Sequence, residues 1–256
     1  MKNQKVTVSE VGTQTAGLSS RRSFLKVSGL ALAGTGLLIA GCSDDDDSGS
    51  GSGNANELPG VRNGKFDLGG GDAGILTYAY ALEQLEADFY TRVVNGSSFT
   101  SIFNADEQQV LADLYAHEVI HREFFKRALT TALNNTSGTV LPTLEFAYAS
   151  VNFNNRDSVL GTAKALEDTG VRAYNGAGQY ITTPDYLVLA GKIVSVEARH
   201  ASAIRNLIDG RSSASFAGDD IIDSDGLDLA DKPSVVIPVV AGLNFIQTEF
   251  TARFLP

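Results

Sequence analysis

Two glutamate–histidine pairs with the same spacing are the residues of this sequence best suited to chemistry. Glu118 stands three positions before His121, and Glu197 stands three positions before His200. Because residues three apart on a helix lie on the same face, each pair can direct a carboxylate and an imidazole to one point. Carboxylate oxygens and imidazole nitrogens bind divalent transition metals. The chain has three histidines, so finding two of them in this pattern favours a metal site.

Two further glutamates stand where a helical pattern calls for apolar residues. Glu83 lies one turn from Ala79 and Ala87, and Glu167 lies one turn from Ala163. Burial of an uncompensated carboxylate costs roughly several kcal/mol, so four inward carboxylates would be untenable without cations. Two divalent ions would balance four glutamates. The pattern therefore predicts a site for two metal ions inside a helical core.

The elements that would position these residues are four amphipathic helices. Apolar residues recur at helical spacing in each of them, and Asn104 with Glu107 forms a capping-box pattern at the start of the second. A long crossover over residues 135–155 separates the first two helices from the last two. We therefore expect an all-α four-helix bundle of two antiparallel pairs, followed by a C-terminal extension. The expected helices span about residues 72–95, 104–134, 157–174 and 184–209.

Together with the glutamate–histidine pairs, residues 82–90 (LEQLEADFY) make the chain resemble the ferritin-like superfamily, especially its bacterial branch related to desiccation-associated proteins. The resemblance covers about residues 66–210. It implies a dinuclear centre, with iron first and manganese second as its metal. Glu83 and Glu167 would be single-helix ligands, Glu118 and Glu197 bridging or chelating ligands, and His121 and His200 terminal ligands.

Two tyrosines follow the single-helix glutamates at equal distances. Tyr90 is seven residues after Glu83, and Tyr174 is seven residues after Glu167. The resemblance places such tyrosines beside the metals, where they could take part in catalysis. Aromatic core packing with a partner for each hydroxyl explains them equally well.

Two alternatives for the ligands stay open at this point. Glu86 lies one turn after Glu83 and could replace it as the ligand from the first helix, or support it. His117 and His121 frame a His-Glu-x-x-His sequence, in which both histidines would bind zinc and Glu118 would act as general base. That zinc protease would need a third ligand, for which Glu145 and His200 are candidates. It would leave three inward glutamates unexplained.

The N-terminal sixty residues have the composition of an export signal and a tether. Residues 20–26 (SRRSFLK) match the twin-arginine pattern, and residues 27–40 form an apolar run too short for a comfortable membrane span. Residues 39–42 (IAGC) resemble a lipobox, which would make Cys42 the lipidated first residue of the mature protein. An uncleaved signal anchor, or cleavage elsewhere, is the alternative. We expect a signal at 1–41, a Ser/Gly/Asp-rich tether at 42–65, the bundle at 66–210 and the extension at 211–256.

The charge and cysteine content limit the partners. The net charge is −10, and loss of residues 1–41 removes five basic residues and one acidic residue, which leaves −14. Such an acidic body argues against nucleic acid and suits cations. With Cys42 as the only cysteine, no disulfide can form within the chain.

These features lead to one expected function and one competitor. We expect an exported protein of the cell envelope, lipid-anchored and monomeric or a small oligomer. Its metal centre would oxidise Fe(II) or consume O2 or peroxide in stress defence. The competing interpretation is a non-enzymatic scaffold that binds metal or protects against desiccation.

Overall fold

The computed structural model describes residues 57–133, 138–210 and 218–256. These described residues belong to one compact unit. The expected signal at 1–41, the lipidated Cys42 and the tether up to residue 56 lie outside the described residues. Among the helices of the described segments, none combines the length and the apolar character needed to cross a membrane.

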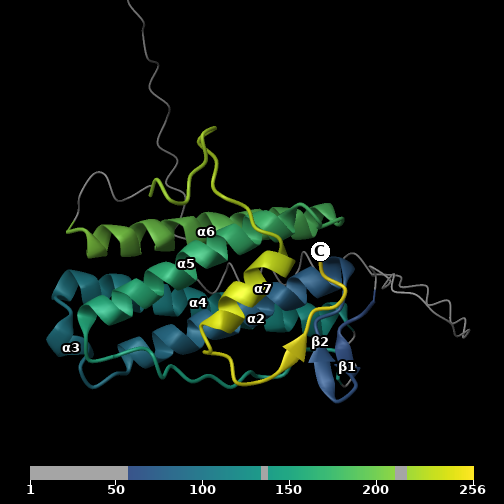
Figure 1. The fold of residues 1–256 in the computed structure, drawn as a ribbon, viewed down its shortest axis with the longest axis horizontal. Coiled ribbons are helices and arrows are strands. Elements are labelled where there is room, and N and C mark those ends of the chain that lie inside the picture. The colour runs from purple at the N-terminus through teal and green to yellow at the C-terminus, as the bar shows by residue number, and fades with distance from the viewer. Residues whose placement is uncertain (1–56, 134–137, 211–217) are drawn as a thin grey trace, which may run out of the picture. The chain divides into compact units, whose positions relative to one another are not determined.

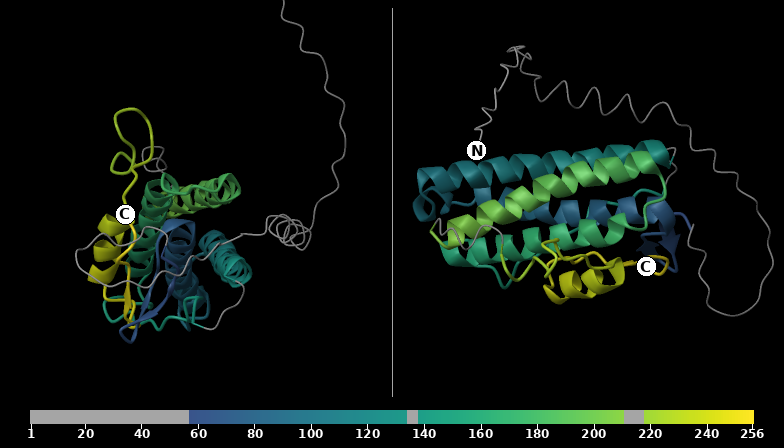
Figure 2. Two further views of the ribbon diagram at one scale, coloured as in Figure 1. Left: turned by 90° about the vertical axis from the view of Figure 1, so that its right-hand side faces the viewer. Right: turned by 90° about the horizontal axis from the view of Figure 1, so that it is seen from above.

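Four long helices run alongside one another and enclose the core (Figures 1 and 2). The first two pack extensively against each other, as do the last two. The expected all-α bundle, with two helix pairs and a long crossover, is confirmed. A short helix, α3 (Phe99–Ile102), lies in the first connection. The long helices are α2 (Gly71–Val94), α4 (Ala105–Ala132), α5 (Arg156–Gly178) and α6 (Pro184–Ile208).

The helix ends are held by side chains of the kinds that the sequence indicates. Asn104 accepts a hydrogen bond from the backbone N–H of Glu107, and the Glu107 carboxylate accepts one from the N–H of Asn104, so the predicted capping box is confirmed. Asp72, in the first turn of α2, accepts hydrogen bonds from the backbone N–H groups of Thr182 and Thr183. This contact fixes the beginning of α6 against the beginning of α2.

The crossover between α4 and α5 is attached to α2 by a buried amide. The side chain of Gln84 accepts a 2.9 Å hydrogen bond from the Leu144 N–H and donates one of 3.3 Å to the Pro142 carbonyl. The Tyr148 hydroxyl donates to the Leu85 carbonyl over 3.2 Å. These hydrogen bonds satisfy the buried side-chain amide of Gln84 and hold the crossover against α2.

A small sheet and a terminal helix flank the bundle. Strands β1 (Gly60–Arg62) and β2 (Lys65–Asp67) are antiparallel, and β3 (Phe250–Thr251) lies parallel to β2. The hairpin thus includes the last residues of the range expected to be a tether. Helix α7 (Pro233–Gly242), in the C-terminal extension, buries Val236 and Val240 and packs against α5.

Candidate metal centre

The six predicted ligand residues meet in the core of the bundle. α2 and α5 each contribute one glutamate, while α4 and α6 each contribute a glutamate and a histidine. The four glutamates are completely buried, and the histidines are 9% and 3% exposed. The structure therefore brings together all six: Glu83, Glu118, His121, Glu167, Glu197 and His200.

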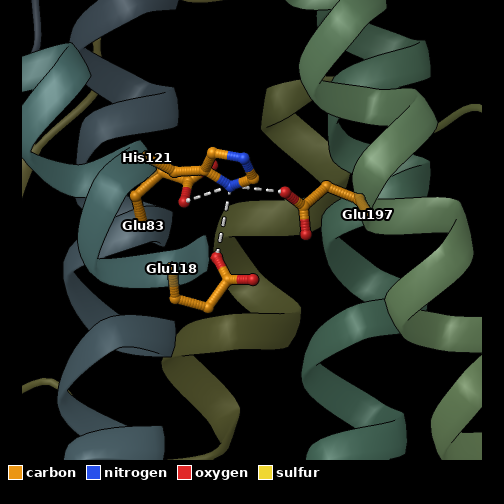
Figure 3. A group of neighbouring side chains, drawn as sticks. All are labelled: Glu83, Glu118, His121 and Glu197. Carbon is orange, nitrogen blue, oxygen red and sulfur yellow. Dashed lines mark ion pairs between the residues drawn. The ribbon is translucent and has the colours of Figure 1, made fainter. Parts of the chain in front are cut away.

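One group, called here the His121 position, consists of Glu83, Glu118, His121 and Glu197 (Figure 3). Nδ1 of His121 lies 2.8 Å from Oε1 of Glu197. The same nitrogen lies 3.5 Å from Oε2 of Glu83 and 3.5 Å from Oε2 of Glu118. The donor atoms lie within 4.8 Å of one another, which is compact enough to hold a metal ion.

The second group, the His200 position, consists of Glu118, Glu167, Glu197 and His200. Nδ1 of His200 lies 2.7 Å from Oε1 of Glu118, 3.4 Å from Oε2 of Glu197 and 3.5 Å from Oε2 of Glu167. Glu118 and Glu197 belong to both groups, each directing a different oxygen to each histidine. Their carboxylates can therefore join two metal positions.

The atoms that face these positions lack hydrogen-bond partners although they are close together. Both histidine Nδ1 atoms and both oxygens of Glu118 and Glu197 are buried without a properly directed hydrogen bond. The short distances therefore reflect atoms that converge on shared points without the directed geometry of a hydrogen bond. Buried polar atoms without partners cost free energy, and cations at these points would remove that cost. The donor set thus fits metal ions.

The two tyrosines bind the outer oxygens of the single-helix glutamates. The Tyr90 hydroxyl on α2 donates a 2.6 Å hydrogen bond to Oε1 of Glu167 on α5. The Tyr174 hydroxyl on α5 donates to Oε1 of Glu83 on α2. Oε2 of each glutamate has no such partner and faces the histidine of its group. Each tyrosine thus fixes one oxygen of a carboxylate and leaves the other for the site.

The family model for the ferritin-like domain matches residues 71–210, which is more than half of the chain. The chain belongs to the ferritin-like domain family. No curated protein matches it in sequence. The matched part of this ferritin-like protein runs from the beginning of α2 past the end of α6, so it contains all six residues of the two groups.

The electrostatics of the ferritin-like core favour protonated histidines when no metal is bound. Burial lowers the pKa of His121, but Glu83, Glu118 and Glu197 outweigh burial and hold this pKa far above its usual value. His200 is affected in the same way by its own neighbouring glutamates. Two imidazolium groups therefore offset part of the buried negative charge, and a metal ion must displace their protons.

The two shared glutamates differ in their proton affinity. Burial and the negative charge of Glu197 raise the pKa of Glu118 to about 8. Burial also acts on Glu197, but the contacts with His121 and His200 outweigh it and lower the pKa of Glu197 to about 2. In the metal-free core, Glu118 therefore holds a proton more readily than Glu197 does.

Glu86 is buried beside the site without joining it. Neither group in the described part of the chain contains one of its atoms, so Glu83 is the α2 glutamate that faces the metal positions. Oε2 of Glu86 has no hydrogen-bond partner. Burial and the charges of the surrounding glutamates raise the pKa of Glu86 well above its usual range. Its carboxyl occupies space left by Gly170, where an added Cβ would lie 3.0 Å from Oε1 of Glu86.

The structure brings together part of the set needed for the zinc-protease alternative, because His200, one candidate third ligand, lies beside both His117 and His121. His117 is exposed and contributes no atom to either group. Its Nδ1 lies 2.9 Å from Nε2 of His200, on the side of that ring away from the carboxylates. Glu145 is exposed on the crossover, where its backbone N–H donates to Thr248. His117 and Glu145 thus contribute no donor atom to a cluster with His121 among the described residues.

Two sets of side-chain contacts at the site were not predicted from the sequence. The pairing of each tyrosine with a glutamate of the opposite helix was not predicted, although the matching seven-residue spacings were the signal for it. The contact between His117 and His200 was not predicted either. Its only sequence signal is that His117 directly precedes an inward glutamate, which places it at the edge of the buried face.

Proposed function

We propose that this ferritin-like protein holds a dinuclear metal centre and that the centre oxidises Fe(II) or consumes O2 or peroxide. Iron is the metal we propose first, and manganese is the second choice. One observation carries the proposal: two groups of buried donor atoms share Glu118 and Glu197, and those atoms lack hydrogen-bond partners. A single metal ion would leave the atoms of the other group uncompensated.

The charges support two divalent ions. Four ionised glutamates carry four negative charges, which two divalent ions neutralise. Glu86 contributes to neither group, and burial with the neighbouring carboxylates raises its pKa, which favours its neutral form. The neutral imidazoles of His121 and His200 complete the donor set without changing the balance. A donor set rich in carboxylates with two imidazoles suits iron or manganese better than metals that prefer sulfur.

The glutamates and tyrosines of the site would have different roles. Glu118 and Glu197 would join the two positions, while Glu83 and Glu167 would each give Oε2 to one position. Tyr90 holds the remaining oxygen of Glu167, which limits the rotation of that carboxylate. Burial raises the pKa of the Tyr90 phenol, so it stays a hydrogen-bond donor at all physiological pH values. Bound ferrous ions would supply the electrons for reduction of dioxygen or peroxide.

The proposed setting is the cell envelope. The twin-arginine pattern at residues 20–26 and the lipobox at 39–42 favour export followed by attachment to a membrane through Cys42. We propose stress defence as the role there, performed by a monomer or small oligomer. The resemblance to the desiccation-associated branch supports this role.

The test measures turnover by the full-length protein. After anaerobic loading with Fe(II), O2 or hydrogen peroxide is added, and the oxidation of Fe(II) is followed by absorbance. We expect oxidation well above that of buffer, a loss of this excess in Glu118→Gln, and no loss in Glu123→Gln, which changes an exposed glutamate of the same helix. Metal binding without turnover would instead favour the non-enzymatic scaffold.

A further inference from the structure

The two metal positions are related by an internal repeat of the bundle. α2 and α4 provide the same residue types at the same spacings as α5 and α6. A glutamate is followed seven residues later by a tyrosine on α2 and α5, and a glutamate is followed three residues later by a histidine on α4 and α6. The repeat alone would make the His121 and His200 positions equivalent.

His117 breaks this equivalence. It directly precedes Glu118 on α4, and the matching residue before Glu197 on α6 is Val196. Nδ1 of His117 lies 2.9 Å from Nε2 of His200, and the two rings are nearly parallel, with an angle of 13° and 5.1 Å between centroids. Val196 has no polar side-chain atom with which to give His121 a corresponding contact.

The direction of this contact follows from the metal-binding state of His200. Its Nδ1 faces the carboxylates, so that nitrogen must present a lone pair to the metal. The proton of the neutral imidazole is then on Nε2, and the N–H donates to Nδ1 of His117. Partners that accept a hydrogen bond from a metal-binding histidine fix its tautomer and the orientation of its ring, and their loss lowers metal affinity by about 10- to 100-fold.

We propose that His117 is a positioning residue for His200 and makes the His200 position the tighter of the two metal positions. This inference rests on the proposed dinuclear centre. His117 adds no ligand atom to either group and acts through the ring of His200. The two positions then fill in order, with the His200 position first.

The test is a titration of the full-length, metal-free protein with Mn(II), in which isothermal calorimetry measures the binding of each ion. The native protein should bind two ions in two steps of different affinity. His117→Ala should weaken the tighter step about 10- to 100-fold and leave the weaker step unchanged. His117→Asn should recover most of the tighter step, because the amide oxygen of asparagine can take the place of Nδ1 as acceptor. Val196→Ala is the matched control and should change neither step.

The outcomes separate this inference from the proposed function. A native protein that binds no metal would refute both. Binding of two ions with equal affinity, or a His117→Ala protein that binds like the native one, would overturn the role of His117 while leaving the dinuclear centre intact. Equal weakening of both steps, or no recovery in His117→Asn, would also overturn it. Since His117 is exposed, its substitution opens no cavity, and circular dichroism should show an unchanged fold.

Discussion

The hydroxyl of Tyr90 donates a 2.6 Å hydrogen bond to Oε1 of Glu167, and this bond connects α2 to α5 across the core. Tyr174 and Glu83 make the reciprocal connection. The two bonds tie the helix pairs together at the level of the metal positions, so the site and the stability of the bundle depend on the same contacts.

Tyr90→Phe should lower the free energy of unfolding of the metal-free protein by about 1–3 kcal/mol, because it leaves a buried carboxylate oxygen without its donor. Urea denaturation in the presence of a chelator measures the change. Tyr80→Phe, at a buried tyrosine three turns earlier on α2, is the control and should cost less. Equal stability of the Tyr90→Phe and native proteins would mean that the bond contributes nothing.

Metal binding should become tighter as the pH rises from about 6 to 8. The metal binds neutral imidazole and ionised carboxylate, whereas the raised pKa values keep His121, His200 and Glu118 protonated in the metal-free core. Binding must therefore release protons. Calorimetry with Mn(II) at pH 7 in buffers of different ionisation enthalpy should show release of two or more protons per chain. Binding heats that do not depend on the buffer would contradict the assigned protonation.

The stability of the metal-free protein should change with pH in the opposite sense. The folded-state pKa of His121 and His200 lies above the unfolded value near 6.5, so their contribution is complete below that pH and is lost as the pH rises. Glu118, with its pKa raised to about 8, adds a loss between about pH 4.5 and 8. Melting temperatures measured with a chelator should therefore fall from pH 6.5 to 9, and each proton accounts for about 1.4 kcal/mol per pH unit.

Protonation of Glu197 should lower the stability of the metal-free protein at acid pH. Its pKa is lowered to about 2, so the stability it contributes is present above about pH 4.5 and is lost as the pH falls towards 2. The metal-free protein should consequently be most stable in mildly acidic solution. A melting temperature that does not fall from pH 6.5 to 9 would contradict the raised pKa values of His121, His200 and Glu118.

The space at Gly170 should be coupled energetically to Glu86. Gly170→Ala places a Cβ 3.0 Å from Oε1 of Glu86, and overpacking of this kind costs about 1–3 kcal/mol. In a Glu86→Ala background the same change should stabilise α5 by about 0.5–1 kcal/mol, because alanine favours a helix over glycine. Gly161→Ala, which meets no neighbouring atom, is the control and should stabilise both backgrounds. A double-mutant cycle on the free energy of unfolding measures the coupling, and additive effects would contradict it.

The bundle and the six core residues were predictable because they depend on local patterns. Helical periodicity identified the four helices, and Glu118 and Glu197 stood out as charged residues among apolar ones. The capping box of Asn104 was visible for the same reason, since both of its partners lie within four residues.

The features that the sequence did not reveal depend on contacts between distant residues. Strand β2 pairs with β3, and Thr251 donates a hydrogen bond to the buried Asp67 from 184 positions away. Strands of two or three residues carry too little alternation to be recognised alone. Glu83 and Glu86 were both plausible ligands because they lie one turn apart, and the rotation of α2 against α5 decides between them. The contact of His117 with His200 likewise depends on how α4 faces α6.

The metal content of the full-length protein tests the central claim most directly. Elemental analysis by mass spectrometry after loading with Fe(II) or Mn(II) should find two metal ions per chain in the native protein. Glu118→Gln should lose both, because its two oxygens face both positions, and Glu123→Gln should keep both. A native protein that holds no metal, or a single zinc ion that is lost in His117→Ala, would contradict the dinuclear centre.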